Sequence, residues 1–175
     1  LRKNILIEYE GRMWTVIEWS IMRNDRRQKV FVTIKDLLSG RVKELTEHGD
    51  SRFEVLDKDN VELSHSYNDG LEAVFYDKDG GEHRCVLEAA KDALQWGSDS
   101  YIGFMVNEKL IMVSPPSSVV IKVKECAPPM KGGNNSWKDA VLENGVKVKV
   151  SNLVNVGERV RIDPVTLEFR ERVTS

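Results

Sequence analysis

The sequence has few of the residues that mark catalytic or metal-binding sites. Among its 175 residues are two cysteines and three histidines, namely Cys85, Cys126, His48, His65 and His83. It contains no Cys-x-x-Cys pair, no His-Glu-x-x-His motif and no glycine-rich phosphate loop ahead of a helix. The two cysteines form neither a metal-ligand pair nor a disulfide framework, so we expect a reducing compartment. The sequence therefore predicts a protein that is not an enzyme, with no catalytic residue, metal ion, cofactor or small-molecule substrate.

Long apolar runs and an excess of charge of one sign are also missing. The longest apolar runs include Leu110–Val113 and Val119–Ile121, far short of the roughly 20 residues that a membrane helix needs. We therefore expect no membrane association. The net charge of -2, from 26 basic and 28 acidic residues, excludes a globally basic nucleic-acid binder but leaves room for local basic faces. Since the chain begins at Leu1, we expect a fragment or a processed product, and no signal-peptide pattern stands at this end.

The charges that are present fall into three blocks along the chain. Residues 1–58 carry a net charge of +2, residues 59–118 of -7 and residues 119–175 of +3. This basic, acidic, basic order predicts three units of about 60 residues each, although chance fluctuation is an alternative explanation. Units of that size bury only about 60% of their unfolded surface. We therefore expect them to be β-rich and partly dependent on packing against one another.

Short alternating segments separated by turn residues dominate the sequence. Strands are predicted at Lys29–Ile34, Arg41–Leu45, Leu63–Tyr67, Leu71–Tyr76, Gly103–Val106, Leu110–Val113, Val119–Val123, Val146–Val150, Val160–Ile162 and Leu167–Arg170. Asn68–Gly70 and Asn144-Gly145 are hairpin turn signals. Only Val86 to Leu94 has helical spacing, with Gly97 placed to end the helix. The pattern predicts an all-β protein of small β-barrels with one short helix in the middle unit.

The first candidate functional segment is a basic loop near the N-terminus. We expect Met22–Lys29 to join a strand that ends near Ser20 to one that starts at Val30. Four of its eight residues are basic, and no large apolar side chain after Met22 would tie it down. Such a loop can project and reach phosphates through its guanidinium groups. The alternative is a solvated hairpin tip with an accidental cluster of charge.

A second candidate segment, Lys131–Lys138, combines two glycines and two asparagines with flanking cations. We expect a mobile loop that exposes backbone N–H groups. Trp137 could stack on a base there, or it could simply cover the core of a small barrel.

A third candidate is the last predicted hairpin, where Arg159, Arg161, Arg170 and Arg172 alternate along two strands. The spacing places them on one outward face of each strand. They form either a compact basic face or the ordinary solvated side of an amphipathic sheet.

Six motifs, in order, carry a family resemblance. They are Val32–Arg41, Ser66–Gly70 with Val74–Asp77, Ser114–Pro116 with Val119–Val123, Glu125–Gly132, Ala140–Gly145, and Val156–Asp163 extending through Arg172. For example, Glu125–Gly132 is similar to "E-T-x-P-G-x-K-G" and Ala140–Gly145 to "A-T-L-x-T-G". Together they resemble bacterial-type elongation factor P and its organellar relatives over nearly the whole chain. The Pro-Pro-Met wording at Pro128–Met130 is closer to mitochondrial members, so we expect a mitochondrial location, with the bacterial cytoplasm as the alternative.

The resemblance implies three domains in an elongated arrangement. These are an N-terminal KOW/SH3-like domain at 1–58 with a tip loop at 22–29, an acidic OB-like domain at 59–118 and an OB-like domain at 119–175. It also implies a monomer that binds the ribosome between the peptidyl and exit tRNA sites, where its tip helps stalled chains form the next peptide bond. The expected contacts are rRNA, peptidyl-tRNA and mRNA.

The family's motif positions imply which residues touch RNA. In the tip loop they are Arg23, Asn24, Asp25, Arg26, Arg27 and Lys29, and in the last domain Lys131, Gly132, Gly133, Asn134, Trp137, Lys138, Arg161, Arg170 and Arg172. The family's tip usually reads "P-G-K-G", whereas the matching positions here are Arg23-Asn24-Asp25-Arg26. An alternative is therefore a permanent, RNA-contacting component of an organellar ribosome or another large complex, without rescue activity. A third possibility is an unrelated small-molecule-binding β protein.

Overall fold

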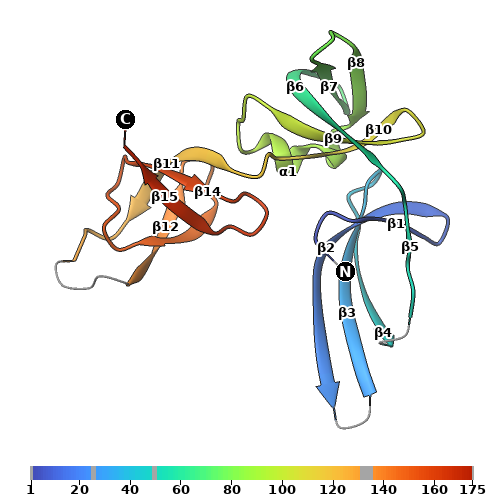
Figure 1. The fold of residues 1–175 in the computed structure, drawn as a ribbon, viewed down its shortest axis with the longest axis horizontal. Helices are drawn as coiled ribbons and strands as arrows, with labels where there is room; N and C mark the ends of the chain where they lie inside the picture. The colour runs from blue at the N-terminus through green and yellow to red at the C-terminus, as the bar shows by residue number, and fades with distance from the viewer. Residues whose placement is uncertain (1, 25–26, 49–50, 131–135, 175) are drawn as a thin grey trace. The chain divides into compact units, whose positions relative to one another are not determined.

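The chain folds almost entirely into β-structure (Figure 1). The computed structural model describes residues 2–24, 27–48, 51–130 and 136–174. Within these segments fifteen strands form three five-stranded sheets, joined by one 3-10 turn and one short helix. The prediction of an all-β fold with short helical structure in the middle is confirmed. No helix of the described segments is long and apolar enough to cross a membrane.

The first sheet is built from the N-terminal part of the chain. Its strands are β1 (Leu6–Tyr9), β2 (Arg12–Asn24), β3 (Arg27–Asp36), β4 (Val42–His48) and β5 (Glu54–Val55), in the order β4-β3-β2-β1-β5. Alternation along β3 turns Val32 and Ile34 into the core, where they meet Ile7, Trp14 and Val16.

A long hairpin of β2 and β3 dominates this sheet (Figure 1). Its register runs from Trp14 opposite Asp36 to Asn24 opposite Arg27, with a bulge between Val16 and Glu18. Only residues 25 and 26 lie between the strands, so the prediction of an eight-residue loop over 22–29 was wrong in extent. The polar residues there pair across the ribbon, because a hairpin with both faces in solvent does not need apolar alternation.

The middle sheet begins at β6, directly after the first sheet in the sequence. Its strands are β6 (Asp59–Asp69), β7 (Glu72–Asp77), β8 (Glu82–Val86), β9 (Tyr101–Val106) and β10 (Lys109–Ser114), in the order β10-β9-β6-β7-β8. Between β8 and β9 lie the 3-10 turn η1 (Leu87–Ala89) and the helix α1 (Lys91–Leu94). The single helix predicted over Val86 to Leu94 is thus divided at Ala90, whose φ of -124° and ψ of -21° interrupt it.

The third sheet contains the rest of the chain. Its strands are β11 (Val119–Cys126), β12 (Trp137–Leu142), β13 (Lys147–Ser151), β14 (Arg159–Ile162) and β15 (Phe169–Val173), in the order β13-β12-β11-β14-β15. The predicted turn at Asn144-Gly145 is confirmed: Gly145 has a φ of +84°, which glycine adopts without strain, and its N–H donates to the Leu142 carbonyl. Trp96, which precedes β9 in the sequence, is buried in this sheet's core.

The contacts divide the chain into two compact units. One unit holds residues 1–92 and 99–114, and therefore both of the first two sheets, while the other holds residues 93–98 and 115–175. The three predicted domains at 1–58, 59–118 and 119–175 stay a prediction.

Candidate functional site

The far end of the β2–β3 hairpin places its two described cations on opposite faces. Arg23 on β2 stands opposite Gln28, and Met22 stands opposite Lys29 on β3. Directly opposed residues of an antiparallel pair share a face, so Lys29 projects with Met22 and Arg23 projects with Gln28. Both cations are exposed. Cationic groups on both faces allow this hairpin to contact two phosphate backbones rather than one.

The rest of the predicted tip lies outside the described residues or has side chains that the structure does not describe. Asp25 and Arg26 lie outside the described residues, and the side chains of Asn24 and Arg27 are not described. Of the six predicted tip residues, the structure brings the four that it describes, Arg23, Asn24, Arg27 and Lys29, onto one hairpin end.

Large apolar side chains flank these cations, and sequence reasoning missed them. Trp19, Ile21 and Met22 on β2 are 37%, 43% and 54% exposed, and Phe31 on β3 is 37% exposed. The register puts Phe31 on the face of Lys29, and Trp19 and Ile21 on the face of Arg23. Aromatic rings beside cations suit RNA, because the rings stack on bases while the cations reach phosphates. The missed signal was one aromatic residue on each side of the charged run, Trp19 before it and Phe31 after it.

A buried carboxylate at the opposite end of β3 fixes the base of this hairpin. Asp36 is 1% exposed; its carboxylate accepts hydrogen bonds from the N–H groups of Leu38 and Ser39 at 2.8 and 3.0 Å and from the Arg12 guanidinium at 2.8 Å. Burial works to raise the pKa of the Asp36 carboxyl, but these donors outweigh it and hold the pKa below its ordinary value. The ionised carboxylate therefore orders the turn that follows β3.

The third sheet presents a second candidate surface around Trp137. Trp137 opens β12, is 60% exposed and meets the ring of Phe169 edge-on. Both rings line an open groove whose other walls come from β11, β12, β13 and the segment before β15. Part of the Trp137 ring covers Phe169, which packs against the core, and the rest is accessible to a base.

One predicted cation next to Trp137, Lys138, is less available than the sequence indicates. The Lys138 ammonium donates to the backbone carbonyls of Ala127, just after β11, and Val154, after β13. The remaining predicted loop residues, Lys131, Gly132, Gly133 and Asn134, lie outside the described residues.

Three of the four candidate arginines of the last hairpin pair with carboxylates. Arg161 pairs with Glu171 at 2.8 Å, Arg170 with Asp163 at 3.0 Å and Arg172 with Glu158 at 2.8 Å. Of the two interpretations, a compact basic face or the solvated side of an amphipathic sheet, the ion pairs favour the second. Exposed pairs of this kind contribute only about 0–1 kcal/mol, so a phosphate can still compete for the guanidinium groups.

Catalytic chemistry has little support in the described segments. Burial raises the pKa of the Cys85 thiol to about 12, with the Glu72 charge adding to the effect, so Cys85 is a poor nucleophile. The Asp77 carboxylate and the His83 ring are 2.7 Å apart, but Asp77 also accepts from the Gly81 N–H, which makes it a turn residue. No group of three or more His, Cys, Asp or Glu side chains within the described ranges could hold a metal ion.

Comparison with known proteins adds family information. A family model described as "Elongation factor P, C-terminal" matches residues 119–172. Elongation factor P of Burkholderia mallei is 31% identical over 178 residues, which cover 98% of this chain and 96% of that protein. The factor from Thermodesulfovibrio yellowstonii is 30% identical, with 98% and 95% covered. A solved structure titled "Eukaryotic translation initiation factor 5A from Methanococcus jannaschii" is 15% identical with a TM-score of 0.42, covering 65% of this chain and 88% of that one.

The two relatives are bacterial proteins. The predicted mitochondrial location therefore gains no support from them.

Proposed function

The chain belongs to the elongation factor P family, and from this we propose that it binds the ribosome between the peptidyl and exit tRNA sites. There it assists peptide-bond formation on stalled chains, in the bacterial cytoplasm. The observation that carries the proposal is the identity of 30–31% over 98% of the chain, which includes the tip hairpin as well as the third sheet. This function needs no catalytic side chain, because holding two reactants in position can by itself lower the barrier of a reaction.

The hairpin supplies the surface for this role. Its end carries Arg23 and Lys29 on opposite faces, and Trp19 and Phe31 stand behind them on the same two faces. We infer that the cations contact phosphates of peptidyl-tRNA and rRNA while the rings pack on exposed bases. The groove beside Trp137 supplies a second RNA contact in the third sheet, where mRNA is the third expected partner.

A second candidate is a permanent component of a large RNA-containing complex. The tip sequence favours it, because Arg23-Asn24-Asp25-Arg26 has neither the lysine nor the glycines of the usual "P-G-K-G" apex. The Asp25 charge is also repelled by phosphates at the acceptor end of a tRNA.

Ribosome pelleting over a salt gradient, paired with translation of a message that encodes consecutive prolines, separates the two candidates. A transient factor should dissociate between about 50 and 200 mM salt as its phosphate contacts are screened, and should relieve the stall. A permanent component should stay bound through high salt and leave the stall unchanged. Failure to bind at low salt, with the stall also unchanged, would contradict both candidates.

A further inference from the structure

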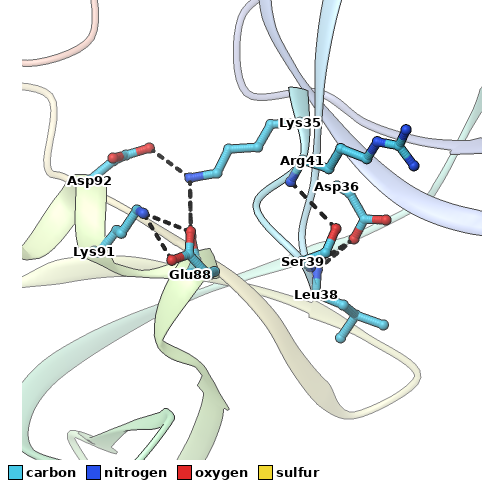
Figure 2. A network of polar contacts seen from close by, with 8 residues as sticks. All are labelled: Lys35, Asp36, Leu38, Ser39, Arg41, Glu88, Lys91 and Asp92. Atoms are coloured by element: carbon cyan, nitrogen blue, oxygen red, sulfur yellow. Dashed lines mark hydrogen bonds and ion pairs between the residues drawn. The ribbon is translucent and has the colours of Figure 1, made fainter. Parts of the chain in front are cut away.

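A buried lysine on β3 joins the first sheet to the helical segment of the middle part of the chain. Lys35 is 8% exposed, and its ammonium donates to the Glu88 carbonyl oxygen at 3.2 Å and to the Asp92 carboxylate at 3.1 Å. Figure 2 shows its ion pairs with the carboxylates of Asp92 and Glu88. Glu88 lies in η1 and Asp92 in α1. Because Val32 and Ile34 face the core, the alternation of β3 places Lys35 on the opposite face, against this helical segment. All of these residues belong to the same compact unit.

One partner of Lys35, Glu88, makes further contacts of its own. The Lys91 ammonium approaches Oε2 of the Glu88 carboxylate to 2.7 Å, and the same oxygen lies 3.9 Å from the Lys35 ammonium (Figure 2). Gly40 packs so closely against the Glu88 carboxylate that an added Cβ would collide with it, and its φ of +70° also favours glycine. The Glu88 carboxylate, 38% exposed, therefore lies between Lys35, Lys91 and the turn at Gly40.

The strand that carries Lys35 also carries the functional tip. β3 is continuous from Arg27 to Asp36 and is hydrogen-bonded to β2 along this length. Lys35 stands eight positions from Arg27, which is about 26 Å along an extended strand. A tilt of about 10° at Lys35 would therefore move the tip by about 4–5 Å. A displacement of the tip by a few ångströms changes the rate of a reaction whose reactants must be held in a set geometry.

We propose that Lys35 is a positioning residue: it locks the first sheet to the η1–α1 segment and so sets the direction in which the β2–β3 hairpin projects from the middle sheet. The effect of this contact on translation rests on the proposed function. The contact between Lys35 and the η1–α1 segment is itself a property of the free protein.

Other contacts keep the two sheets together when Lys35 is removed. The Lys58 ammonium lies over the Phe104 ring, 3.1 Å from its centre, and donates to the Asn4 carbonyl, while the Asn4 side-chain amide lies 3.4 Å from the Ser114 hydroxyl. We therefore expect Lys35→Met to fold and to loosen the hairpin's direction rather than to separate the sheets. Lys43→Met is the matched control, since Lys43 forms an exposed pair with Glu10 inside the first sheet.

The test measures the distance between spin labels at Met22 on the hairpin and Leu71 in the β6–β7 turn. Both positions are exposed, and the labels go into the full chain after Cys85→Ala and Cys126→Ser replacement. Lys35→Met should broaden the distance distribution at least twofold, whereas Lys43→Met should leave its width unchanged. The exchange of charges in Lys35→Glu with Asp92→Lys should restore part of the narrow distribution.

An unchanged width in Lys35→Met, or equal broadening in Lys43→Met, would overturn the proposal. This readout uses no ribosome, so failure of the lock and failure of the proposed function are separate results. Circular dichroism melting confirms that each variant is folded before the distances are compared.

Discussion

The ring of Trp137 meets the ring of Phe169 edge-on, with their centroids 5.9 Å apart and their planes at 78°. The two residues begin β12 and β15, which are not hydrogen-bonded neighbours in the sheet. A single parallel bridge between Lys149 and Glu168 lies near them. The aromatic pair therefore helps to curl the sheet toward closure while it leaves Trp137 60% exposed at the groove.

Replacement of this ring should separate binding from folding. Trp137→Ala removes a stacking surface, so we expect the dissociation constant for ribosomes to rise about tenfold, within the ~1–3 kcal/mol that a stacked base contributes. The melting temperature should change little because the ring is mostly exposed. Leu153→Ala, at a 52% exposed apolar position outside the groove, is the control and should bind normally. Normal binding by both variants would remove the groove from the RNA surface.

Neutralising the tip should weaken ribosome association. For Arg23→Ala with Arg26→Ala and Arg27→Ala, we expect the logarithm of the binding constant to depend less steeply on the logarithm of salt concentration. The slope should fall by about 2–3, because each phosphate contact contributes about 0.7–0.9. Binding over a salt series measures this slope.

The control for the tip variant removes the same charge elsewhere. Arg52, Lys78 and Lys109 are exposed and outside the candidate surfaces, so their joint replacement by alanine should change the slope much less. If both triple variants behave alike, the effect belongs to net charge and not to the tip.

Asp36 should make a pH-dependent contribution to stability. Asp36→Asn removes the ionised acceptor of the turn, so the free energy of unfolding at pH 7 should fall by about 1–3 kcal/mol. A depressed carboxyl pKa gives stability that is present above the unfolded pKa and is lost as the pH falls through the folded pKa. The difference between the two proteins should therefore shrink below about pH 4.

Urea unfolding at pH 7 and pH 3 measures this difference. Asp139→Asn is the control, since the Asp139 side chain is 89% exposed and pairs only at the surface with Lys149. A difference for Asp36→Asn that stays constant with pH would contradict the assignment.

The two thiols should differ sharply in reactivity. Cys85 is 5% exposed and burial raises its pKa to about 12, whereas Cys126 is partly exposed at the groove. At pH 8 an aromatic disulfide reagent should modify Cys126 in the folded protein and reach Cys85 only after unfolding. The variant Cys126→Ser should show no fast phase, and fast modification of that variant would show that Cys85 is accessible.

Apolar alternation and turn-residue signals, which depend only on neighbouring residues, predicted most of the strands and turns. Alternation around Val146–Val150 and the turn at Asn144-Gly145 depend on neighbouring residues only, and both are confirmed. Local rules failed at Met22–Lys29, where cross-strand pairing extends the strands through a charged run. They also failed to show the break at Ala90, because helical spacing carries no information on where packing bends the chain.

Contacts between distant residues could not be predicted in the same way. The sequence shows Lys35 as one cation among many, since its partner Glu88 is 53 positions away and only the fold brings them together. The arginines of the last hairpin give the same lesson. Their spacing indicates a basic face, but the register that sets Glu171 opposite Arg161 is a property of the paired strands.

The position of Trp96 has a consequence for how the protein is made. Each sheet is a continuous stretch of sequence, so the first two can form in turn as the chain is synthesised. Trp96 is an exception, because it leaves the ribosome between α1 and β9 yet is buried among residues that are translated later, from Val119 to Ile162. Until that last stretch has emerged, the Trp96 indole stays exposed to solvent. Its fluorescence should therefore report the moment at which a nascent chain completes its structure.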